Sequence, residues 1–260
     1  MAQASLKSLQ NIVQSALDPS KAAVMATKLG RRFMDQKGSL SDADYKKWLE
    51  ANAIDMDAYL QRFDTTMVSE AKQFTEHLSV TADAVLSKIP HDLGGGGGVP
   101  FLYLITRLRQ PMVVVETGVA AGFSSATFLS ALEKNGKGHL YSSDFPYFRL
   151  KNPEQYVGVV VDKNLKERWS LLLEGDDSNL PVILARASRI DIFHYDSDKS
   201  YKGRSRAMRL VTPRLAPNAL IIMDDIQDNC HFHDLLAQHK GKPWQVIRYD
   251  GKYIGVIGQI

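Results

Sequence analysis

The sequence lacks the residues and runs that would place it in an oxidising compartment or a membrane. It has one cysteine, Cys230, in 260 residues, so no internal disulfide can form, and free thiols are typical of a reducing compartment. No run of about 18 apolar residues is present to span a bilayer, and residues 1–14 lack the apolar core of a secretion signal. These absences predict a cytoplasmic protein without a membrane partner.

An excess of charge of one sign is also missing. The sequence has 32 lysines and arginines against 29 aspartates and glutamates, a net charge of +3. So small an excess creates no field that would attract a polyanion, and aromatic residues are not interleaved with the basic ones. We therefore expect no nucleic-acid partner. The composition is otherwise that of a globular chain large enough to bury a core.

Three segments differ in composition and periodicity. Residues 1–93 show apolar residues at helical spacing and no catalytic pattern, which predicts a helical cap or an oligomerisation surface in a homo-oligomer. Residues 94–110 begin with five consecutive glycines, a flexible run that suits either a linker or a mobile lid. Residues 111–260 alternate short apolar runs with helical stretches.

The alternation in residues 111–260 predicts an α/β fold with a mostly parallel, Rossmann-like sheet. The expected buried strands are 112–115, 140–143, 169–173, 190–195 and 219–223. They are followed by a hairpin of two strands, 244–249 and 253–257, around Asp250 and Gly251. The sheet is therefore expected to have seven strands, preceded by the helical region and ending in an antiparallel pair.

A glycine-rich turn, Glu116-Thr117-Gly118-Val119-Ala120-Ala121-Gly122-Phe123-Ser124, follows the first expected strand. Gly118 and Gly122 allow a tight turn and a close approach of the backbone to a ligand, and the helix that follows presents free N–H groups. The dinucleotide fingerprint G-x-G-x-x-G is absent because Ala120 occupies its second glycine position. This absence disfavours a dinucleotide-dependent oxidoreductase.

Acidic residues follow the later strands. Asp144 ends the second strand, where a carboxylate accepts hydrogen bonds from ribose hydroxyls, and Asp176 follows the third. Asp196 follows the fourth strand and Asp224-Asp225 the fifth. Because the carboxyl ends of parallel strands face one crevice, we expect these acids to converge there. A divalent cation with oxygen ligands, such as Mg²⁺, would relieve the repulsion among the last three.

The order of these motifs resembles that of class I S-adenosylmethionine (SAM)-dependent methyltransferases over residues 111–260. The turn resembles their first motif, E-x-G-x-x-x-G, and the D-x-x-K pattern from Asp196 to Lys199 resembles metal-dependent O-methyltransferases of the catechol and caffeoyl-CoA type. Residues 190–201 are also similar to bacterial natural-product tailoring methyltransferases, including those that act on macrolide sugars. That group often has histidine at the position of Lys199, and the catechol group usually has asparagine at the position of Asp225, so the sequence combines two patterns.

The resemblance implies a role for individual residues. Asp196, Asp224 and Asp225 would hold the divalent cation. Lys199 would be the general base for a small hydroxylated substrate (a natural product, sugar or phenolic), with His231 as the alternative base. The residues that bind the cofactor SAM would be Glu116, Thr117, Gly118, Gly122, Ser124, Asp144, Asp176 and Asp196.

Other interpretations stay open. The chain would be a metal-independent small-molecule methyltransferase if the acids form a rim without an ion. It would be a non-catalytic nucleotide-binding Rossmann protein if transfer has been lost. The basic residues between Lys202 and Arg214 predict a solvated helix face, with recognition of an anionic substrate as the alternative.

Overall fold

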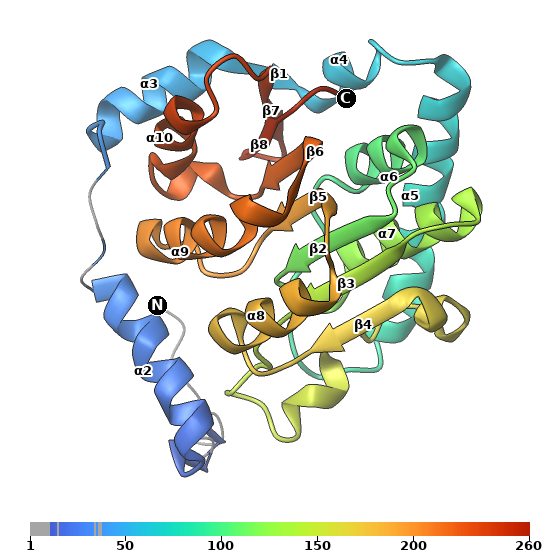
Figure 1. The fold of residues 1–260 in the computed structure, drawn as a ribbon. Coiled ribbons are helices and arrows are strands. Elements are labelled where there is room, and N and C mark those ends of the chain that lie inside the picture. The colour runs from blue at the N-terminus through green and yellow to red at the C-terminus, as the bar shows by residue number, and fades with distance from the viewer. Residues whose placement is uncertain (1–10, 15, 34, 36–37) are drawn as a thin grey trace.

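An eight-stranded sheet lies at the centre of the computed structural model, which describes residues 11–14, 16–33, 35 and 38–260 (Figure 1). The strands are β1 (Ala53–Asp55), β2 (Val113–Thr117), β3 (His139–Ser143), β4 (Trp169–Leu172), β5 (Ile190–Tyr195), β6 (Leu215–Met223), β7 (Trp244–Tyr249) and β8 (Lys252–Ile257). Their spatial order is β1-β7-β8-β6-β5-β2-β3-β4. Only β8 runs antiparallel to its neighbours, β6 and β7. The predicted Rossmann-like sheet with a C-terminal hairpin is confirmed.

The prediction of seven strands is wrong by one. The eighth strand, β1, comes from the N-terminal helical region and pairs in parallel with β7 at the edge of the sheet. Arg248 of β7 donates hydrogen bonds to both carboxylate oxygens of Asp55 in β1, at 2.8 and 3.2 Å. A strand of three residues is too short to show a period of two, so the sequence pattern did not reveal it.

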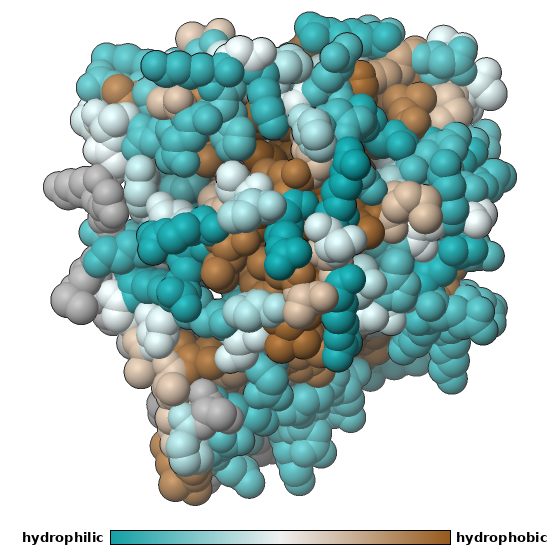
Figure 2. Space-filling view, in the orientation of Figure 1, coloured by the Kyte–Doolittle hydropathy of each residue, from teal (hydrophilic) through white to brown (hydrophobic). Residues whose placement is uncertain are grey.

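Helices cover both faces of the sheet (Figure 1). One layer contains α4 (Met56–Leu60), α5 (Thr65–Leu86), α6 (Val99–Arg109) and α7 (Phe123–Asn135). The other contains α3 (Asp42–Asn52), α8 (Asp176–Arg186), α9 (Tyr201–Val211) and α10 (His231–Gln238). Short 3₁₀ helices span Pro153–Tyr156, Lys163–Arg168, Thr212–Arg214 and Ile226–Asp228. In the same view hydrophilic residues cover most of the surface, and hydrophobic ones show mainly near its centre (Figure 2).

The segment 94–110, expected to be a linker or a lid, is irregular only in its first part. Residues 99–109 form α6, in which Phe101, Leu104 and Ile105 are fully buried. This helix packs in one hydrophobic core with α5, α7 and β2. Helices α4, α5 and α6 therefore share a core with the sheet.

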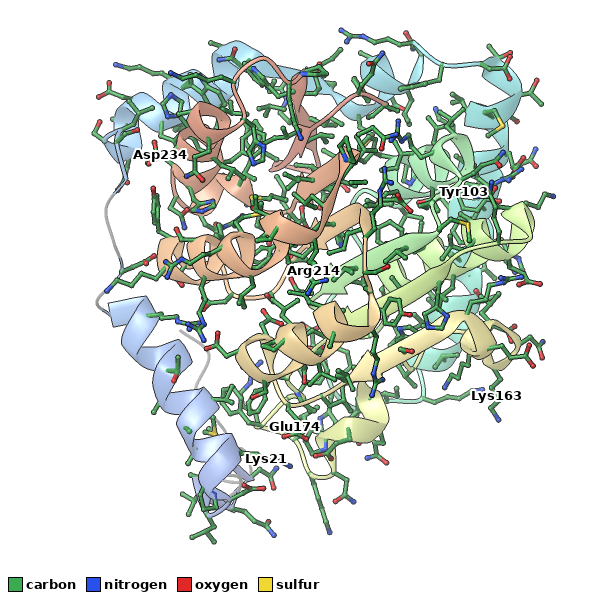
Figure 3. The ribbon with its side chains drawn as sticks, in the orientation of Figure 1. Lys21, Tyr103, Lys163, Glu174, Arg214 and Asp234 are labelled. Atoms are coloured by element: carbon green, nitrogen blue, oxygen red, sulfur yellow. The ribbon has the colours of Figure 1, made fainter. Side chains whose placement is uncertain are left out.

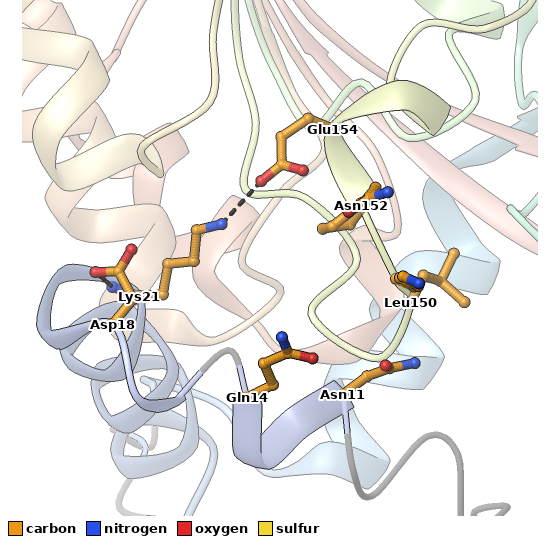
Figure 4. Close-up of a pocket in the computed structure, with 9 residues that line it drawn as sticks. Asn11, Gln14, Asp18, Lys21, Leu150, Asn152 and Glu154 are labelled. Atoms are coloured by element: carbon orange, nitrogen blue, oxygen red, sulfur yellow. Dashed lines mark hydrogen bonds and ion pairs between the residues drawn. The ribbon is translucent and has the colours of Figure 1, made fainter.

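Helix α2 (Pro19–Phe33) lies at the periphery of the molecule, near the start of α8 (Figure 1). Lys21 donates a hydrogen bond to Glu154 at 2.8 Å, across a cavity of about 310 Å³ (Figure 4). Glu154 raises the pKa of Lys21, and Glu174, which lies near it, adds to this effect (Figure 3). Residues 1–10, where the sequence predicted no secretion signal, lie outside the described residues. Among the described helices, none combines the length and apolar character needed to cross a membrane.

Arg204 does not lie on the solvated helix face that the basic residues of α9 predicted. It is fully buried, and its guanidinium donates to the backbone oxygens of Asp224 and Asp225 at 3.1 and 2.9 Å. The guanidinium also lies over the ring of Tyr195, 5.8 Å from its centre. Because Arg204 bonds to main-chain atoms, it fixes the backbone that follows β6.

We predict that replacing Arg204 will destabilise the fold far more than replacing a basic neighbour on the same helix. Arg204→Ala removes the guanidinium donor from the buried backbone oxygen of Asp224 and from that of Asp225, and it opens a cavity, so the free energy of unfolding should fall by about 3 kcal/mol. Arg209→Ala, at an exposed position of α9, should change it by no more than about 0.5 kcal/mol. Urea denaturation of both variants measures the difference, and equal effects would contradict the assigned role.

Candidate functional site

The carboxyl ends of five parallel strands meet at one edge of the sheet. In the register of the sheet, Thr117 at the end of β2 pairs with Ser143 of β3 and Tyr195 of β5. Tyr195 in turn pairs with Met223 of β6, and Ser143 with Leu172 of β4. The residues that follow each strand therefore lie along the same edge, which is where open α/β sheets bind ligands.

The turn after β2 requires glycine at two positions. Gly118 has φ +84°, and a Cβ there would lie 2.3 Å from the backbone oxygen of Asp196. Gly122 has φ +102°, and a Cβ there would lie 2.7 Å from the Cα of Gly158. The backbone nitrogen of Asp196 also donates to the oxygen of Thr117 at 2.8 Å. Glycine thus lets the turn pass directly against the end of β5.

Asp144 lies at the end of β3 and contacts this turn. Its Oδ2 accepts hydrogen bonds from the backbone nitrogens of Val119 and Ala120 at 3.2 and 2.8 Å. Its Oδ1 accepts one from the nitrogen of Phe145 at 2.6 Å. The carboxylate therefore lies at the strand end, as the sequence predicted, and it holds the turn in place.

Asp176, the first residue of α8, joins the ends of two strands. Its Oδ1 accepts a hydrogen bond from Ser143 at 2.7 Å, and its Oδ2 accepts one from the hydroxyl of Ser197. Ser197 follows β5 and also donates to Thr117 at 3.2 Å. The structure therefore brings Asp176, Asp144 and the glycine turn to the same part of the edge.

Helix α2 closes part of this edge, which the sequence did not predict. A cavity of about 290 Å³ lies between α2 and residues 175–178. Arg31 of α2 forms ion pairs across it with Asp177 at 2.7 Å and with Asp198 at 3.2 Å. These contacts join residues more than 140 positions apart, so no local pattern could have indicated them.

Asp196, Asp224 and Asp225 converge as expected. Each offers a carboxylate oxygen, and the three oxygens lie within 4.8 Å of one another. Asp224 is only 7% exposed. Asp225 has the left-handed φ of +50°, which turns the chain directly after β6. We call these three residues the acidic cluster.

Two lysines balance part of the charge of the acidic cluster. Lys199 bonds to Asp196, and its Nζ lies 3.0 Å from Asp225; Lys252 lies 3.2 Å from Asp225. Burial lowers the pKa of Lys199, but the charges of Asp196 and Asp225 outweigh burial and raise it overall. Burial alone would raise the pKa of Asp225, but Lys199 and other donors lower it to about 2.

The C-terminal hairpin supplies two residues of the edge that the sequence did not identify. Lys252 begins β8, and Tyr249 ends β7 with its hydroxyl 3.2 Å from Oδ1 of Asp224. The hairpin itself was predicted. Which of its side chains reach the edge depends on how β8 pairs with β6, and that pairing has no local signal.

Some predicted site residues lie beneath the edge. Glu116 is fully buried, and its Oε2 accepts hydrogen bonds from Ser125 at 2.5 Å and Ser142 at 2.8 Å. Thr117 is also fully buried, whereas Ser124 is half-buried in the first turn of α7. Glu116 therefore supports the turn from below, through bonds to the neighbouring elements.

His231 is buried away from solvent and packs against Tyr201. The two ring centres are 4.9 Å apart, and His231 is 3% exposed. Burial, followed by the charge of Arg204, lowers the pKa of His231 to about 4, so the ring is neutral at pH 7. Its described contacts do not join it to the acidic cluster.

A second cavity adjoins Lys199. It has a volume of about 520 Å³ and is lined by Asp35, Ser197, Asp198, Lys199, Ser200, Asp228 and Asn229. Asn229 donates to the backbone oxygen of Lys199 at 2.7 Å. The cavity therefore adjoins the lysine that pairs with Asp196 and Asp225, and the described residues of its wall are polar.

Comparison with known proteins agrees with this geometry. Residues 115–226, which run from β2 to the residue after the acidic pair, match a family model described as a methyltransferase domain. A curated relative, ribosomal RNA large subunit methyltransferase E of Methanosphaera stadtmanae, is 27% identical over 126 residues. That match covers 48% of this chain and 61% of the relative, so the chain spans about three fifths of the relative's length.

Solved structures share the fold. The O-methyltransferase TomG of Streptomyces achromogenes, in complex with SAM, has a TM-score of 0.56 at 17% identity, over 70% of this chain and 89% of that one. The O-methyltransferase of Bacillus cereus, in complex with S-adenosylhomocysteine (SAH), has a TM-score of 0.52 at 17% identity, over 81% and 100%. An SAH-bound methyltransferase of Podospora anserina has a TM-score of 0.52 at 11% identity, over 76% and 97%.

The family match covers the glycine turn and the acidic residues at the strand ends, and the structural matches share the architecture that brings these residues together. Residues 115–226 therefore match a methyltransferase domain, and the chain has the fold of the methyltransferases to which it is structurally similar.

Proposed function

We propose that the chain transfers the methyl group of SAM to a hydroxyl oxygen of a small molecule, with the help of a divalent cation. The observation that carries this proposal is the position of the acidic cluster and Lys199 on the same sheet edge as Asp144, Asp176 and the glycine turn. A methyl donor bound at the turn would present its sulfonium toward the lysine. In-line transfer depends mainly on such alignment.

The cofactor's parts correspond to the features of the edge. The methionine part would lie over the turn from Gly118 to Gly122, where the absence of side chains permits close approach. The ribose hydroxyls would contact Asp144 and the adenine amino group Asp176, as the resemblance implies. Helix α2 would then cover the adenosine, because its cavity is lined by Gly175, Asp176 and Asp177.

The donor set of the acidic cluster fits a hard divalent cation. Three carboxylate oxygens within 4.8 Å of one another provide the oxygen ligands that Mg²⁺ takes, with waters and substrate oxygens completing its coordination. A bound cation of this kind supplies positive charge that lowers the pKa of a coordinated hydroxyl. Asp196, Asp224 and Asp225 would hold it.

Lys199 is the residue we assign as the general base. Its ammonium is now held by Asp196 and Asp225, which raise its pKa. Carboxylates that are engaged in metal binding attract the ammonium less, so Lys199 would lose the interaction that retains its proton. It would then accept the proton of the acceptor hydroxyl. His231, buried against Tyr201, is not needed in this scheme.

The cavity beside Lys199 is where we place the acceptor. Its described lining contains three aspartates, of which Asp198 is paired with Arg31, one lysine, two serines and an asparagine. This lining favours an uncharged or cationic acceptor that carries several hydroxyl or amino groups. An anionic acceptor would be repelled by Asp35 and Asp228.

A metal-independent methyltransferase is the second candidate, and one observation favours it. Lys199 and Lys252 already place positive charge against Asp196 and Asp225, so the repulsion in the acidic cluster is reduced by the chain itself. Turnover in excess chelator separates the two candidates, because the metal-assisted reaction stops and the metal-independent one continues.

We predict that Asp176→Ala will weaken the binding of SAM while Asp83→Ala, at an exposed position of α5, will have little effect. Asp176 bonds to the strand ends through Ser143 and Ser197. Loss of a hydrogen bond to a carboxylate should weaken binding about 10-fold. Equilibrium dialysis with labelled SAM measures this, and equal effects would remove Asp176 from the cofactor site.

Direct binding of Mn²⁺ tests the acidic cluster. We expect one Mn²⁺ per chain for the unmodified protein, measured as the loss of the free-ion signal in electron paramagnetic resonance. Asp224→Ala should abolish this binding, because it removes the most buried of the three ligands. Asp228→Ala, four residues on and outside the acidic cluster, should retain it. Failure of the unmodified protein to bind Mn²⁺ would exclude the metal-assisted reaction.

Replacing Lys199 tests the base. Lys199→Met should lower turnover of a hydroxylated acceptor by about 100-fold or more, the usual contribution of a general base, while SAM affinity changes little. Lys202→Met is the matched control, since Lys202 lies three residues later at an exposed position. Turnover by this variant should stay near that of the unmodified protein. The acceptor is found by screening neutral, cationic and anionic hydroxylated compounds for label from methyl-labelled SAM. An unchanged rate for Lys199→Met would rule out this assignment.

A further inference from the structure

We propose that Tyr249 is a positioning residue for Asp224, and that the glycine segment before α6 holds Tyr249 in place. This inference rests on the proposed function, because it gives Tyr249 a role at the acidic cluster. It concerns residues outside the matched methyltransferase domain: Tyr249 ends β7, and the glycine segment, residues 94–98, precedes α6.

Tyr249 supplies the side-chain hydrogen bond to Asp224. Its hydroxyl lies 3.2 Å from Oδ1 and 3.5 Å from Oδ2 of that carboxylate. Lys199 and Lys252 bond instead to the other two acids, Asp196 and Asp225. The phenol is the donor and the carboxylate of Asp224 the acceptor.

The backbone of Gly97 packs directly against the hydroxyl of Tyr249. A Cβ at position 97 would lie 1.8 Å from the Tyr249 oxygen and 2.7 Å from Cζ. Both separations are far shorter than van der Waals contact, so any side chain at this position would displace the phenol. Glycine at position 97 is thus a condition for the Tyr249–Asp224 hydrogen bond.

The glycine segment packs closely against two elements, β7 through Tyr249 and α7 through Phe123. A Cβ at Gly96 would lie 2.5 Å from the Cβ of Phe123, the first residue of α7. A Cβ at Gly95, in contrast, would have no other atom within 4 Å, and the φ of Gly95 is not left-handed. The run of glycines therefore contains positions where close packing requires glycine, and one where alanine should be tolerated.

The aromatic ring of Tyr249 has a separate packing role. The ring packs against the same hydrophobic core as α6 and α7, whereas the hydroxyl contacts Asp224. Tyr249→Phe removes the hydroxyl and keeps the ring, so it separates positioning from packing. Partners that orient a metal ligand commonly change metal affinity by 10-fold or more when they are removed.

The test is Mn²⁺ binding, measured by electron paramagnetic resonance on the full chain, for Tyr249→Phe, Gly97→Ala, the double variant and the control Gly95→Ala. We expect Tyr249→Phe and Gly97→Ala each to weaken Mn²⁺ binding about 10-fold. The double variant should bind no more weakly than either single variant, because both changes remove the same hydrogen bond. Gly95→Ala should bind as the unmodified protein does.

Two further measurements separate positioning from a general loss of structure. The unfolding temperature and the affinity for SAH, determined by calorimetry, should stay near the original values in Tyr249→Phe. If Gly97→Ala unfolds, Mn²⁺ binding by Tyr249→Phe alone decides whether Tyr249 positions Asp224.

The outcomes distinguish this inference from the proposed function. If the unmodified protein binds Mn²⁺ and Tyr249→Phe binds it equally well, Tyr249 does not position Asp224, and the proposed function stands. Additive losses in the double variant would also overturn the link between Gly97 and Tyr249. If the unmodified protein binds SAH but no Mn²⁺, the metal site fails, and the role of Tyr249 fails with it.

Discussion

Repulsion among three carboxylates is the constraint on which this edge of the sheet depends. Asp196, Asp224 and Asp225 follow two neighbouring strands and bring their oxygens within 4.8 Å of one another, where like charges away from bulk water repel strongly. The chain opposes this repulsion with groups from two segments. Lys199 comes from the loop after β5, and Lys252 and Tyr249 come from the C-terminal hairpin. The hairpin is therefore part of the site's electrostatics as well as of the sheet.

The chain backbone sets the remaining geometry, through close contacts that exclude side chains. At Gly118 the turn after β2 contacts the backbone of Asp196, so the glycine turn and the first acid of the acidic cluster are fixed relative to each other. Arg204 bonds to the backbone oxygens of Asp224 and Asp225 and fixes the other two acids. The glycine turn and the acidic cluster are thus joined by backbone contacts, and the alignment that the proposed methyl transfer needs depends on them.

Local sequence patterns predicted most of the sheet and the acids at its edge. Strands β2 to β8 have apolar runs or alternation, and residues that follow parallel strands share one edge whatever the details of packing. The three-residue β1, the pairing of Arg31 with Asp177, and the contact of Tyr249 with Asp224 depend on segments far apart in the sequence. The exposed position predicted for Arg204 was wrong for a related reason. Its basic neighbours on α9 indicate an exposed face, whereas its burial depends on hydrogen bonds to the backbone that follows β6.

Calorimetric titration of SAH into the unmodified protein tests the central claim, that this edge binds SAM as a methyl donor. We predict saturable binding of one SAH per chain, which competes with SAM and is retained in the presence of chelator, because Asp144, Asp176 and the glycine turn lie outside the acidic cluster. The absence of binding for both SAH and SAM, at two temperatures so that a vanishing enthalpy is not mistaken for no binding, would contradict it.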